Sequence, residues 1–442
     1  MDKETLKKLV CEQADHDREA VISLSKDIYA HPETGYKEVR TTEKLADALS
    51  LLGLPVDKNI AVTGCRAYAN QEKNGPKIVV MGELDSVICR DHPDCDKETG
   101  AVHACGHNFQ VSVMYGVADV LIRSGVIGEL SGKVDFMAVP AEEYIELDYR
   151  KQLREEGKLR YYAGKPELIS KGAFDDVDMC MMVHNWPIAK DGFTCASMNT
   201  GNGFIGKKTW FIGKQSHAGQ APWDGINALN MCTLAINNMH AQRETFKDSD
   251  RVRVHQIINK GGDIVNSVPA NVELETTVRA RTVEALRDAN NKVNRAIRAA
   301  AITLGGEAVV EDAPGQMPMN ADPSLAALFK ENAARFYPEE TIMDCMEATG
   351  SFDMGDISLL MPILHGITTG VSGGLHGPDY RIENYDDALI TPVKILACTV
   401  IDLLYGNAEK AREIKENFRP VFDKKGYLDL LASLECRFDY KD

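Results

Sequence analysis

An alternation of strand, helix and strand in the first half of the chain is the feature that most restricts its fold. The segments KIVVMGE (77–83), KVDFMAV (133–139) and DMCMMVH (178–184) are short and mostly apolar, as expected of strands buried on both faces of a parallel sheet. Between the first two, apolar residues recur at helical spacing at Val111, Met114, Val117, Ala118 and Leu121. The pattern predicts a βαβ unit, and hence an α/β fold with a mostly parallel central sheet.

A different pattern begins near residue 200. Strands are predicted at 207–213, 251–258, 271–280 and 307–312, and helices at 221–242 and 282–305, the earlier helix having Pro222 near its first turn. This order, β-α-β-β-α-β, is that of a ferredoxin-like sandwich. Because 442 residues exceed what one hydrophobic core usually holds, we expect two domains. Residues 1–199 and 315–442 would form a larger, discontinuous α/β domain, and 200–314 an inserted α+β domain.

The charge balance and the cysteine pattern narrow the function classes. Lys and Arg total 50 against 66 Asp and Glu, and a net charge of −16 repels a phosphate backbone. The apolar stretch 389–405 is interrupted by Lys394 and Asp402 and is too short for a membrane span. The N-terminus MDKETLKKLV lacks an apolar signal core, and eleven cysteines without a C-x-x-C pair suit reduced thiols. We therefore expect a cytoplasmic protein that binds neither nucleic acid nor membranes.

Chemically active side chains gather near the predicted strand ends. The segment AVHACGHNFQ (101–110) holds His103, Cys105 and His107 in the loop that leads into the helix of the βαβ unit. Further candidate groups come at or just after predicted strands, namely Asp85, Glu142, Glu143, His184 and His376. Because reactive groups in open α/β sheets gather at the carboxyl edge of the strands, we expect these side chains to share one crevice.

This set of donors suits a borderline divalent metal. One thiolate, three imidazoles and two adjacent carboxylates are ligands that such ions prefer, and two metals would use them without strain. Glu142 and Glu143 follow a strand on an irregular turn, where neighbouring side chains point in different directions. One carboxylate can therefore bind metal while the other takes a proton from the metal-bound water and later delivers it to a leaving amine.

Other interpretations of these residues remain open. Cys105 could be a nucleophile with His107 as its base, although Glu142, Glu143, His184 and His376 would then have no role. The chain could also be a binding protein that keeps an enzyme fold without turnover. A structural zinc, additional to the first site, could be held by Cys89, His92, Cys95 and His103.

Five ordered motifs carry a resemblance to a known family. They are HACGHN (103–108), PAEE (140–143), VHNWP (183–187), GKQSHAGQAPWDGINAL (213–229) and LHGPDY (375–380). In this order they resemble the signature series of the M20 metallopeptidases, in particular the amidohydrolase branch with its aminoacylase-like, hippurate and aminobenzoyl-glutamate hydrolases. HPETGYKE (31–38) and residues 261–280 also resemble that family, so that the match spans most of the chain.

The resemblance implies a site with two divalent metal ions per chain. The family's ligand positions correspond to Cys105, His107, Glu143, His184 and His376. Zn²⁺ is favoured by a thiolate and three imidazoles, with Mn²⁺, Co²⁺ or Ni²⁺ as alternatives. Glu142 stands at the position of the general base that activates the metal-bound water, and Asp85 at that of an aspartate supporting a ligand histidine.

The resemblance also assigns roles to the inserted domain. His217 corresponds to a histidine that polarises the scissile carbonyl, often across a dimer formed through the inserted domain, so a homodimer or higher homo-oligomer is expected. Candidates for contact with the substrate are Asn266, Arg279, Gly373 and Gly374. The expected reaction is hydrolysis of the amide bond in a small N-acyl amino acid, aminobenzoyl-amino acid or dipeptide-like compound.

The chain departs from the family pattern at three places. Glu83 stands where the broader family has a histidine two residues before the strand-end aspartate, a histidine that the amidohydrolase branch generally lacks. Asn108 replaces the aspartate that follows the second histidine of the cluster in many branch members. The connection 144–165, YIELDYRKQLREEGKLRYYAGK, is longer and more charged than expected and is a candidate border of the substrate pocket.

Overall fold

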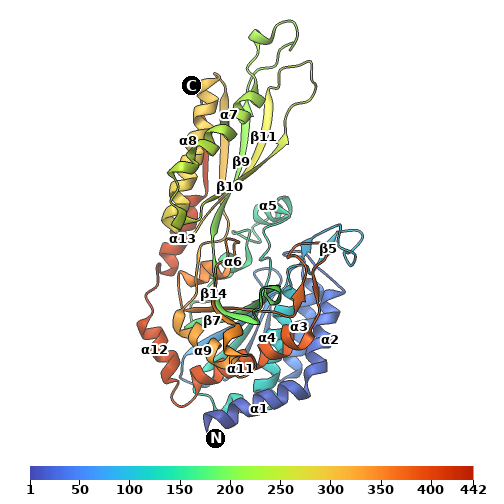
Figure 1. The fold of residues 1–442 in the computed structure, drawn as a ribbon, viewed down its shortest axis with the longest axis vertical. Coiled ribbons are helices and arrows are strands. Elements are labelled where there is room, and N and C mark those ends of the chain that lie inside the picture. The colour runs from blue at the N-terminus through green and yellow to red at the C-terminus, as the bar shows by residue number, and fades with distance from the viewer. Residues whose placement is uncertain (442) are drawn as a thin grey trace. The chain divides into compact units, whose positions relative to one another are not determined.

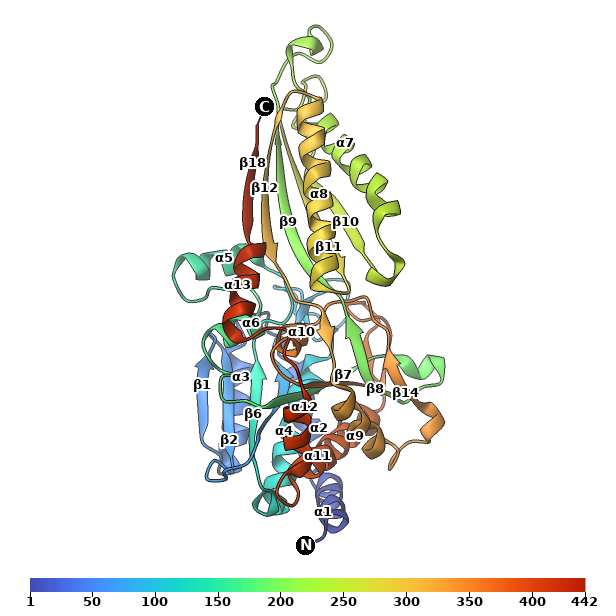
Figure 2. The same ribbon diagram turned by 90° about the vertical axis from the view of Figure 1, so that its left-hand side faces the viewer.

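The computed structural model describes residues 1–441, which divide into two units (Figures 1 and 2). The first unit contains Met1–Thr200, Asn320–Glu347 and Asp356–Val421. The second contains Gly201–Met319, Ala348–Gly355 and the described chain from Phe422 onward. Residues 315–442 were expected in the larger domain, but the stretch after Val421 packs with the second unit.

The first unit is built on a nine-stranded mixed sheet. Its strand order is β1-β2-β6-β3-β7-β15-β8-β13, with β14 paired to β8. The central strands β3 (Lys77–Glu83), β6 (Lys133–Val139), β7 (Met179–Asn185) and β15 (Ile363–Thr368) run parallel. The outer strands are β1 (Val56–Ile60), β2 (Gly64–Ala69), β8 (Cys195–Gly201), β13 (Met319–Asn320) and β14 (Ile342–Met346). The three predicted apolar strands are thus confirmed at the centre of the sheet, where both of their faces are buried.

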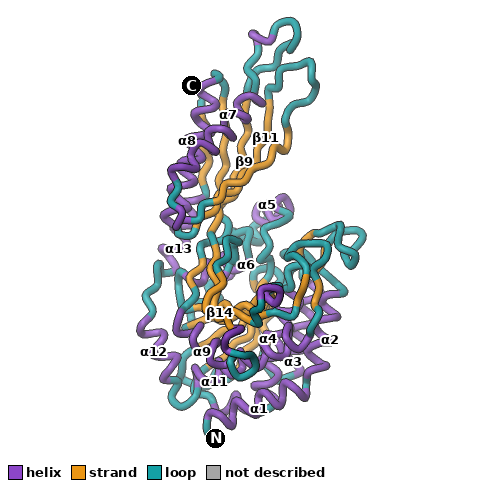
Figure 3. The backbone as a smooth tube through the Cα atoms, viewed as in Figure 1, coloured by secondary structure: helices purple, strands orange, loops and turns teal. Residues whose placement is uncertain are grey.

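Helix α4 (His107–Arg123) is the central helix of this unit. It packs on β3, and every residue from His107 to Leu121 is buried, which completes the predicted βαβ unit. The helices packed around it are α1 (Lys3–His16), α2 (Arg18–Tyr29), α3 (Val39–Leu51) and α11 (Thr391–Leu404) (Figure 3). Further helices of this unit are α5 (Leu147–Glu155), α6 (Gly164–Ser170), α9 (Pro323–Ala333) and α12 (Glu409–Asn417), and α10 (Met354–Ser358) begins in the second unit and ends in the first.

No single helix among residues 1–441 is long and apolar enough to cross a membrane. One pair of helices bent at a break, Asp386–Leu404 with Glu409–Asn417, meets the test by length and composition alone.

The second unit is an antiparallel sheet covered by helices. Its strand order is β10-β11-β9-β12-β18, formed by β9 (Gly203–Ile212), β10 (Arg253–Lys260), β11 (Asn271–Ala280), β12 (Glu307–Pro314) and β18 (Cys436–Tyr440). Burial alternates along β9 and β11, as expected where one face of a sheet packs on a core. Helices α7 (Ala228–Ala241) and α8 (Val283–Thr303) pack together on this face (Figure 2), and α13 (Lys424–Leu434) precedes β18.

The predicted β-α-β-β-α-β order is confirmed as β9-α7-β10-β11-α8-β12, with one helix boundary wrong. The helix predicted from residue 221 begins at Ala228, where the Asn227 side chain accepts from the Asn230 backbone N–H at 3.1 Å. Pro222–Asp224 form only a 3₁₀ turn, and Gly225, in extended conformation, separates this turn from the helix. Pro222 therefore begins the short 3₁₀ helix and not α7.

Candidate metal centre

The candidate groups come from five separate segments of the first unit. Asp85 follows β3, Glu142 and Glu143 follow β6, and His184 lies near the end of β7. Cys105 and His107 flank the start of α4, and His376 lies in the loop between β16 (Val371–Ser372) and β17 (Arg381–Ile382). The parallel arrangement of β3, β6 and β7 brings their carboxyl ends to one edge of the sheet.

The structure brings the proposed metal ligands together. They form three groups of three residues, and within each group the potential ligand atoms lie within 4.8 Å of one another. The groups are Cys105/His107/His184, Cys105/Glu143/His376 and Glu83/His107/Glu142. The Cys105 Sγ lies 3.6 Å from His184 Nε2, and His376 Nε2 lies 3.1 Å from Glu143 Oε1. A thiol and an imidazole that are 271 positions apart in the chain therefore share one cluster.

Gly106 allows Cys105 and His107 to face the same centre. It has φ +86°, in the left-handed region where a side chain is disfavoured. A Cβ at this position would also collide with the Tyr380 hydroxyl and the Asn185 side-chain amide. Tyr380 donates its hydroxyl to Asn185 Oδ1 at 2.9 Å, so the same pair of side chains forms the wall behind the Cys-Gly-His turn.

Neighbouring acceptors orient two of the histidines. His107 Nδ1 lies 2.8 Å from the Asp85 carbonyl and 3.2 Å from Asp85 Oδ1, and His184 Nδ1 lies 2.7 Å from the Asn185 carbonyl. Because a carbonyl can only accept, each Nδ1 carries the proton, and each Nε2 is directed to the cluster with its lone pair when the ring is neutral. Asp85 Oδ2 also accepts from the Glu143 backbone N–H at 2.9 Å, so one carboxylate supports two candidate ligands.

Hydrogen bonds from several segments hold the turn that carries Glu142 and Glu143. Ala141 has φ +52°, and its N–H donates to Glu38 Oε1 at 2.8 Å while its carbonyl accepts from Gly164 N at 3.1 Å. Arg150, which is fully buried, donates through Nη2 to the Glu143 carbonyl and through Nη1 to the Tyr162 carbonyl at 2.6 Å. The HPETGYKE motif and the charged connection 144–165 therefore both support this turn.

The electrostatics of the cluster favour bound positive charge. Burial and the charge of Glu143 raise the pKa of Cys105, but the charge and close approach of His107 and the hydrogen bond with His184 outweigh them and bring it to about 6. Burial lowers the pKa of His376, yet the close approach and charges of Cys105 and Glu143 raise it to about 11. The pKa of His107 is also raised well above its usual value, against burial, chiefly by the charge of Cys105. The raised pKa values mean that His107 and His376 bind protons strongly, because the negative charges of the cluster attract positive charge.

Two potential ligand atoms without a hydrogen bond also indicate that the cluster can bind cations. His107 Nε2 and Glu143 Oε1 are buried and make no hydrogen bond, although ion-pair neighbours lie 3.1–3.3 Å away. A buried polar atom without a hydrogen bond is costly, and a metal ion would satisfy both atoms. The residues present therefore fit a pair of divalent cations, with Cys105 shared between two of the donor groups.

Glu83 and Lys165 belong to this site although sequence reasoning gave them no role. Lys165 has no exposed side-chain surface and donates to Glu83 Oε1 at 2.6 Å. Glu83 Oε2 lies 3.3 Å from His107 Nε2. Burial raises the pKa of Glu83, but the charges of Lys165 and His107 reverse the shift and lower it far below its usual range. Glu83 could be suspected from its spacing to Asp85, whereas nothing in the sequence pairs it with Lys165.

The proposed structural zinc site is not formed among residues 1–441. His92 uses both ring nitrogens, accepting from Asp94 N at 3.1 Å and donating to the Tyr380 carbonyl at 2.9 Å. Neither His92 nor its neighbouring cysteines belong to a group of potential metal ligands in this part of the chain. His103 is buried with no hydrogen bond at either ring nitrogen, and burial lowers its pKa to about 3, so it is neutral.

The candidates of the second unit have their own surroundings. His217 is exposed, and its Nδ1 accepts from the backbone N–H groups of Gly219 and Gln220 at 3.1 Å each. In neutral His217 the proton must therefore lie on Nε2, which makes Nε2 a hydrogen-bond donor. Arg279 donates to Ser351 Oγ at 2.7 Å and lies over the Phe204 ring, and the backbone of Asn266 accepts from Ala218 N at 2.9 Å.

In the first unit, the two glycines proposed to contact substrate form a tight turn. Gly373 has φ +79°, and a Cβ there would collide with the Asp379 backbone. Gly374 donates its N–H to Asp379 Oδ1 at 3.1 Å, so this donor is already used within the loop.

The chain is similar to known proteins over most of its length. The model of a family described as "Peptidase family M20/M25/M40" matches residues 79–402. The chain is 28% identical to the Xaa-Arg dipeptidase of Homo sapiens over 446 residues, which cover 94% of this chain and 92% of that protein. It is 25% identical to the N-acetylcysteine deacetylase of Bacillus subtilis (strain 168) over 343 residues, or 74% and 82% of the two chains. A dinuclear metal-binding M20-family peptidase of Bacillus subtilis has the same fold, with a TM-score of 0.69, 21% identity and coverage of 88% and 99%.

Proposed function

The chain belongs to peptidase family M20/M25/M40, and from this membership we propose that it hydrolyses the amide bond of a small N-acyl amino acid, aminobenzoyl-amino acid or dipeptide-like compound. It is a metal-dependent hydrolase that acts on amide bonds of acyl amino acids or dipeptides, as its family and relatives indicate. The finer substrate choice and the residue roles that follow are our proposal.

The five candidate ligands would hold two divalent cations, and Cys105 belongs to both of the donor groups that contain them. Cys105, His107 and His184 form one group, and Cys105, Glu143 and His376 form the other. When bound, such cations polarise a carbonyl group and make a nearby water molecule more acidic. The thiolate and imidazoles favour Zn²⁺, and Mn²⁺, Co²⁺ or Ni²⁺ are the alternatives. The dinuclear site of the Bacillus subtilis relative supports the count of two.

Glu142 acts as general base and then as general acid. Its carboxylate belongs to the Glu83/His107/Glu142 group, with Oε2 4.0 Å from His107 Nε2, so it stands beside the proposed ligands. Glu142 takes the proton of the attacking water and later delivers it to the nitrogen of the leaving amine. Asp85 keeps His107 and the Glu143 backbone in place during both steps, through the hydrogen bonds to their nitrogens.

His217 donates from Nε2 to the carbonyl oxygen of the substrate as negative charge develops there. The two backbone donors at Nδ1 support this role, since they leave the proton of the neutral ring on Nε2. We propose that His217 serves the site of a second copy of this chain, in a homodimer formed through the inserted domain. Arg279, Asn266 and the Gly373–Gly374 backbone are proposed to contact the substrate.

One observation carries the proposal, namely the convergence of a thiol, three imidazoles and two carboxylates in one cluster, in which every group except the exposed His376 is buried. The test is turnover of N-acetyl, N-benzoyl, aminobenzoyl and dipeptide substrates, including Xaa-Arg dipeptides, by metal-analysed protein. We expect a chelator to abolish hydrolysis and a divalent metal to restore it. Full activity in metal-free protein would refute the proposal.

The lowered pKa of Cys105 would also suit a cysteine nucleophile, so the same experiment needs a second arm. Cys105→Ser should bind less metal and lose activity in proportion to the lost metal. A trapped acyl–Cys105 adduct in chelated, active protein would instead support the cysteine mechanism.

A further inference from the structure

Two cysteines far from each other in the sequence meet between helices of the first unit. Cys11 lies on α1 and Cys398 on α11, helices that pack against each other, and their sulfur atoms are 3.8 Å apart. Cys398 is fully buried, whereas Cys11 is half-buried. Cys11 is therefore the more accessible of the two thiols, and Cys398 is buried in contact with it.

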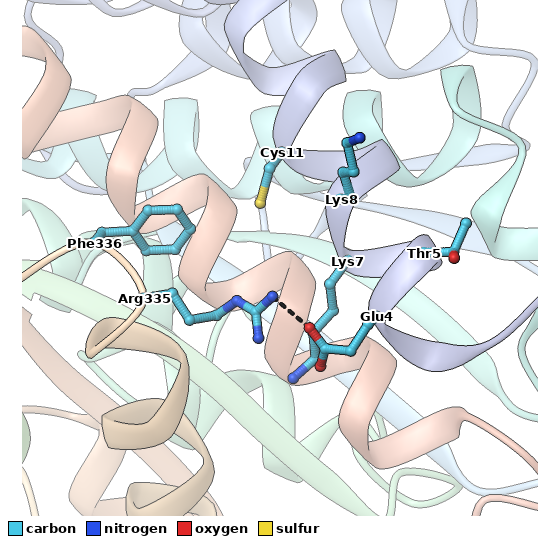
Figure 4. A pocket seen from close by; sticks show the side chains of 7 residues that line it. All are labelled: Glu4, Thr5, Lys7, Lys8, Cys11, Arg335 and Phe336. Atoms are coloured by element: carbon cyan, nitrogen blue, oxygen red, sulfur yellow. Dashed lines mark hydrogen bonds and ion pairs between the residues drawn. The ribbon is translucent and has the colours of Figure 1, made fainter.

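A pocket opens beside Cys11. It has a volume of about 570 Å³ and is lined by Glu4, Thr5, Lys7, Lys8, Cys11, Arg335 and Phe336 (Figure 4). The sulfur of Cys11 points toward Phe336 and Arg335, and Arg335 forms an ion pair with Glu4 at 2.6 Å. Lys7 is paired with the buried Asp402 and Arg335 with Glu4, so the outer positive charge of the lining comes from Lys8, whose ammonium is exposed and 3.6 Å from Glu12. Such a lining favours a small anionic ligand.

The surroundings of Cys11 also suit a reactive thiol. A hydrogen bond with Cys398 lowers the pKa of Cys11, burial opposes this shift, and the charges of Lys394 and Arg335 add to it. For comparison, the pKa of the half-buried Cys436 is raised by burial and by the charge of Asp312. A partly exposed cysteine next to cations, with a second cysteine in contact, has the features of a thiol that undergoes exchange.

We propose that Cys11 is a redox-modification site, at which a low-mass disulfide bearing carboxylates docks in the pocket and exchanges with Cys11, and Cys398 then closes a bridge between α1 and α11. In the first step the Cys11 thiolate attacks one sulfur of the disulfide, a Cys11 mixed disulfide forms, and one thiolate leaves and takes a proton from water. In the second step the Cys398 sulfur attacks the Cys11 sulfur, the S–S bond of the mixed disulfide breaks, and the departing thiolate takes the proton that Cys398 loses. Two cysteine thiols are oxidised, and the incoming disulfide is reduced to two thiols.

The second step requires only a small movement of the two side chains. The sulfurs are in contact at 3.8 Å, and a disulfide bond needs about 2 Å, so side-chain rotation on helices that already pack together has only a short gap to close. This site rests on the thiols and their pocket and is independent of the proposed amide hydrolysis.

The test treats the full-length reduced protein with oxidised glutathione, alkylates the remaining thiols and maps the peptides by mass spectrometry. We expect a Cys11–Cys398 linked peptide in the unaltered chain. Cys398→Ser should instead accumulate one glutathione on Cys11, and Cys11→Ser should give neither product. The half-buried Cys436 is the internal control and should remain alkylatable over the same period.

The pocket is tested separately from the thiol pair. Arg335→Gln should slow exchange with oxidised glutathione several-fold more than exchange with the uncharged hydroxyethyl disulfide, which loses only the smaller effect of Arg335 on the thiolate of Cys11. Lys330→Gln, which removes one positive charge from nearby α9, is the matched control and should leave both rates unchanged. Modification of Cys436 as fast as Cys11, or absence of the linked peptide from the unaltered chain, would overturn the proposal. Neither result requires a variant that might fold poorly.

Discussion

Two buried polar clusters in the same unit differ in how fully their atoms are satisfied. Around Asp402, the Lys7 ammonium donates to Asp402 Oδ2 at 2.6 Å and to Asn332 Oδ1 at 2.8 Å, and Asn332 Nδ2 donates to the same carboxylate at 2.8 Å. None of these side-chain atoms is without a hydrogen bond. In the candidate metal centre, by contrast, His107 Nε2 and Glu143 Oε1 make none. In this pair, the cluster that joins α1, α9 and α11 is satisfied by its own hydrogen bonds, whereas the one proposed to bind metal keeps two ligand atoms without a hydrogen bond.

The largest expected effect is on turnover in the metal centre. Glu142→Gln keeps the shape of the side chain and removes its basicity, so kcat should fall on the order of 10² to 10⁴ through loss of proton transfer. Steady-state kinetics with a substrate from the panel measures this, and metal content per chain should stay at the level of the unaltered protein. Near-normal kcat would contradict the role given to Glu142.

The satisfied cluster should respond in stability instead. Asp402→Ala leaves the Lys7 ammonium buried without its carboxylate, and the free energy of unfolding should fall by about 3–5 kcal/mol. Burial raises the pKa of Asp402, but hydrogen bonds with Lys7, Asn332 and Lys3 lower it below its ordinary 3.8. The loss should thus be complete above the ordinary pKa and shrink as pH falls through the folded-state pKa.

Denaturant titrations at several pH values check this prediction. Activity per folded molecule should remain that of the unaltered chain. If Asp402→Ala kept its stability but lost turnover, the cluster around Asp402 would serve catalysis and not stability.

The positions of the clusters show how far the sequence alone can lead. Asp85, Glu142 and His184 could be grouped in advance because each lies at or near the end of a central strand, and parallel strands share a carboxyl edge. Lys165 could not be assigned to the site in advance, because its segment is rich in charged residues and such segments are usually exposed to solvent. Only the folded structure shows that Lys165 is buried against Glu83. The edge strand β18 was also missed, since its pairing depends on the open edge of β12, more than 100 residues earlier.

His217 extends the comparison to the second unit. His217→Ala should lower kcat roughly 10²- to 10³-fold if its Nε2 donates to the developing oxyanion. If it acts on the site of another copy, mixing the Glu142→Gln and His217→Ala proteins should restore part of the activity, because mixed dimers contain one complete site. Absence of any restoration after subunit exchange would favour action within one chain.

Asp85 separates support of the metal from catalysis. Asp85→Asn removes the charge that faces His107 Nδ1 while keeping the shape of the side chain, so metal affinity should fall roughly 10- to 100-fold. Competition with a chromogenic chelator measures the affinity, and saturating metal should recover most of kcat. The Asp402→Ala protein is the control and should bind metal like the unaltered chain. Equal losses in the two variants would show that general destabilisation, and not the support of His107, governs metal binding.

The smallest effect is expected at Arg150, which contacts the site only through the backbone. Its two donations to the Glu143 and Tyr162 carbonyls fix the turn, and a lysine cannot reach both with the same geometry. Arg150→Lys should therefore lower kcat roughly 10-fold with KM little changed, since the turn carries the base and not the substrate contacts. Arg154→Lys, on the same helix but half-exposed, is the matched control. If added guanidinium restores kcat to Arg150→Ala, Arg150 positions the turn. If both lysine variants instead behave alike, the connection 144–165 contributes packing only.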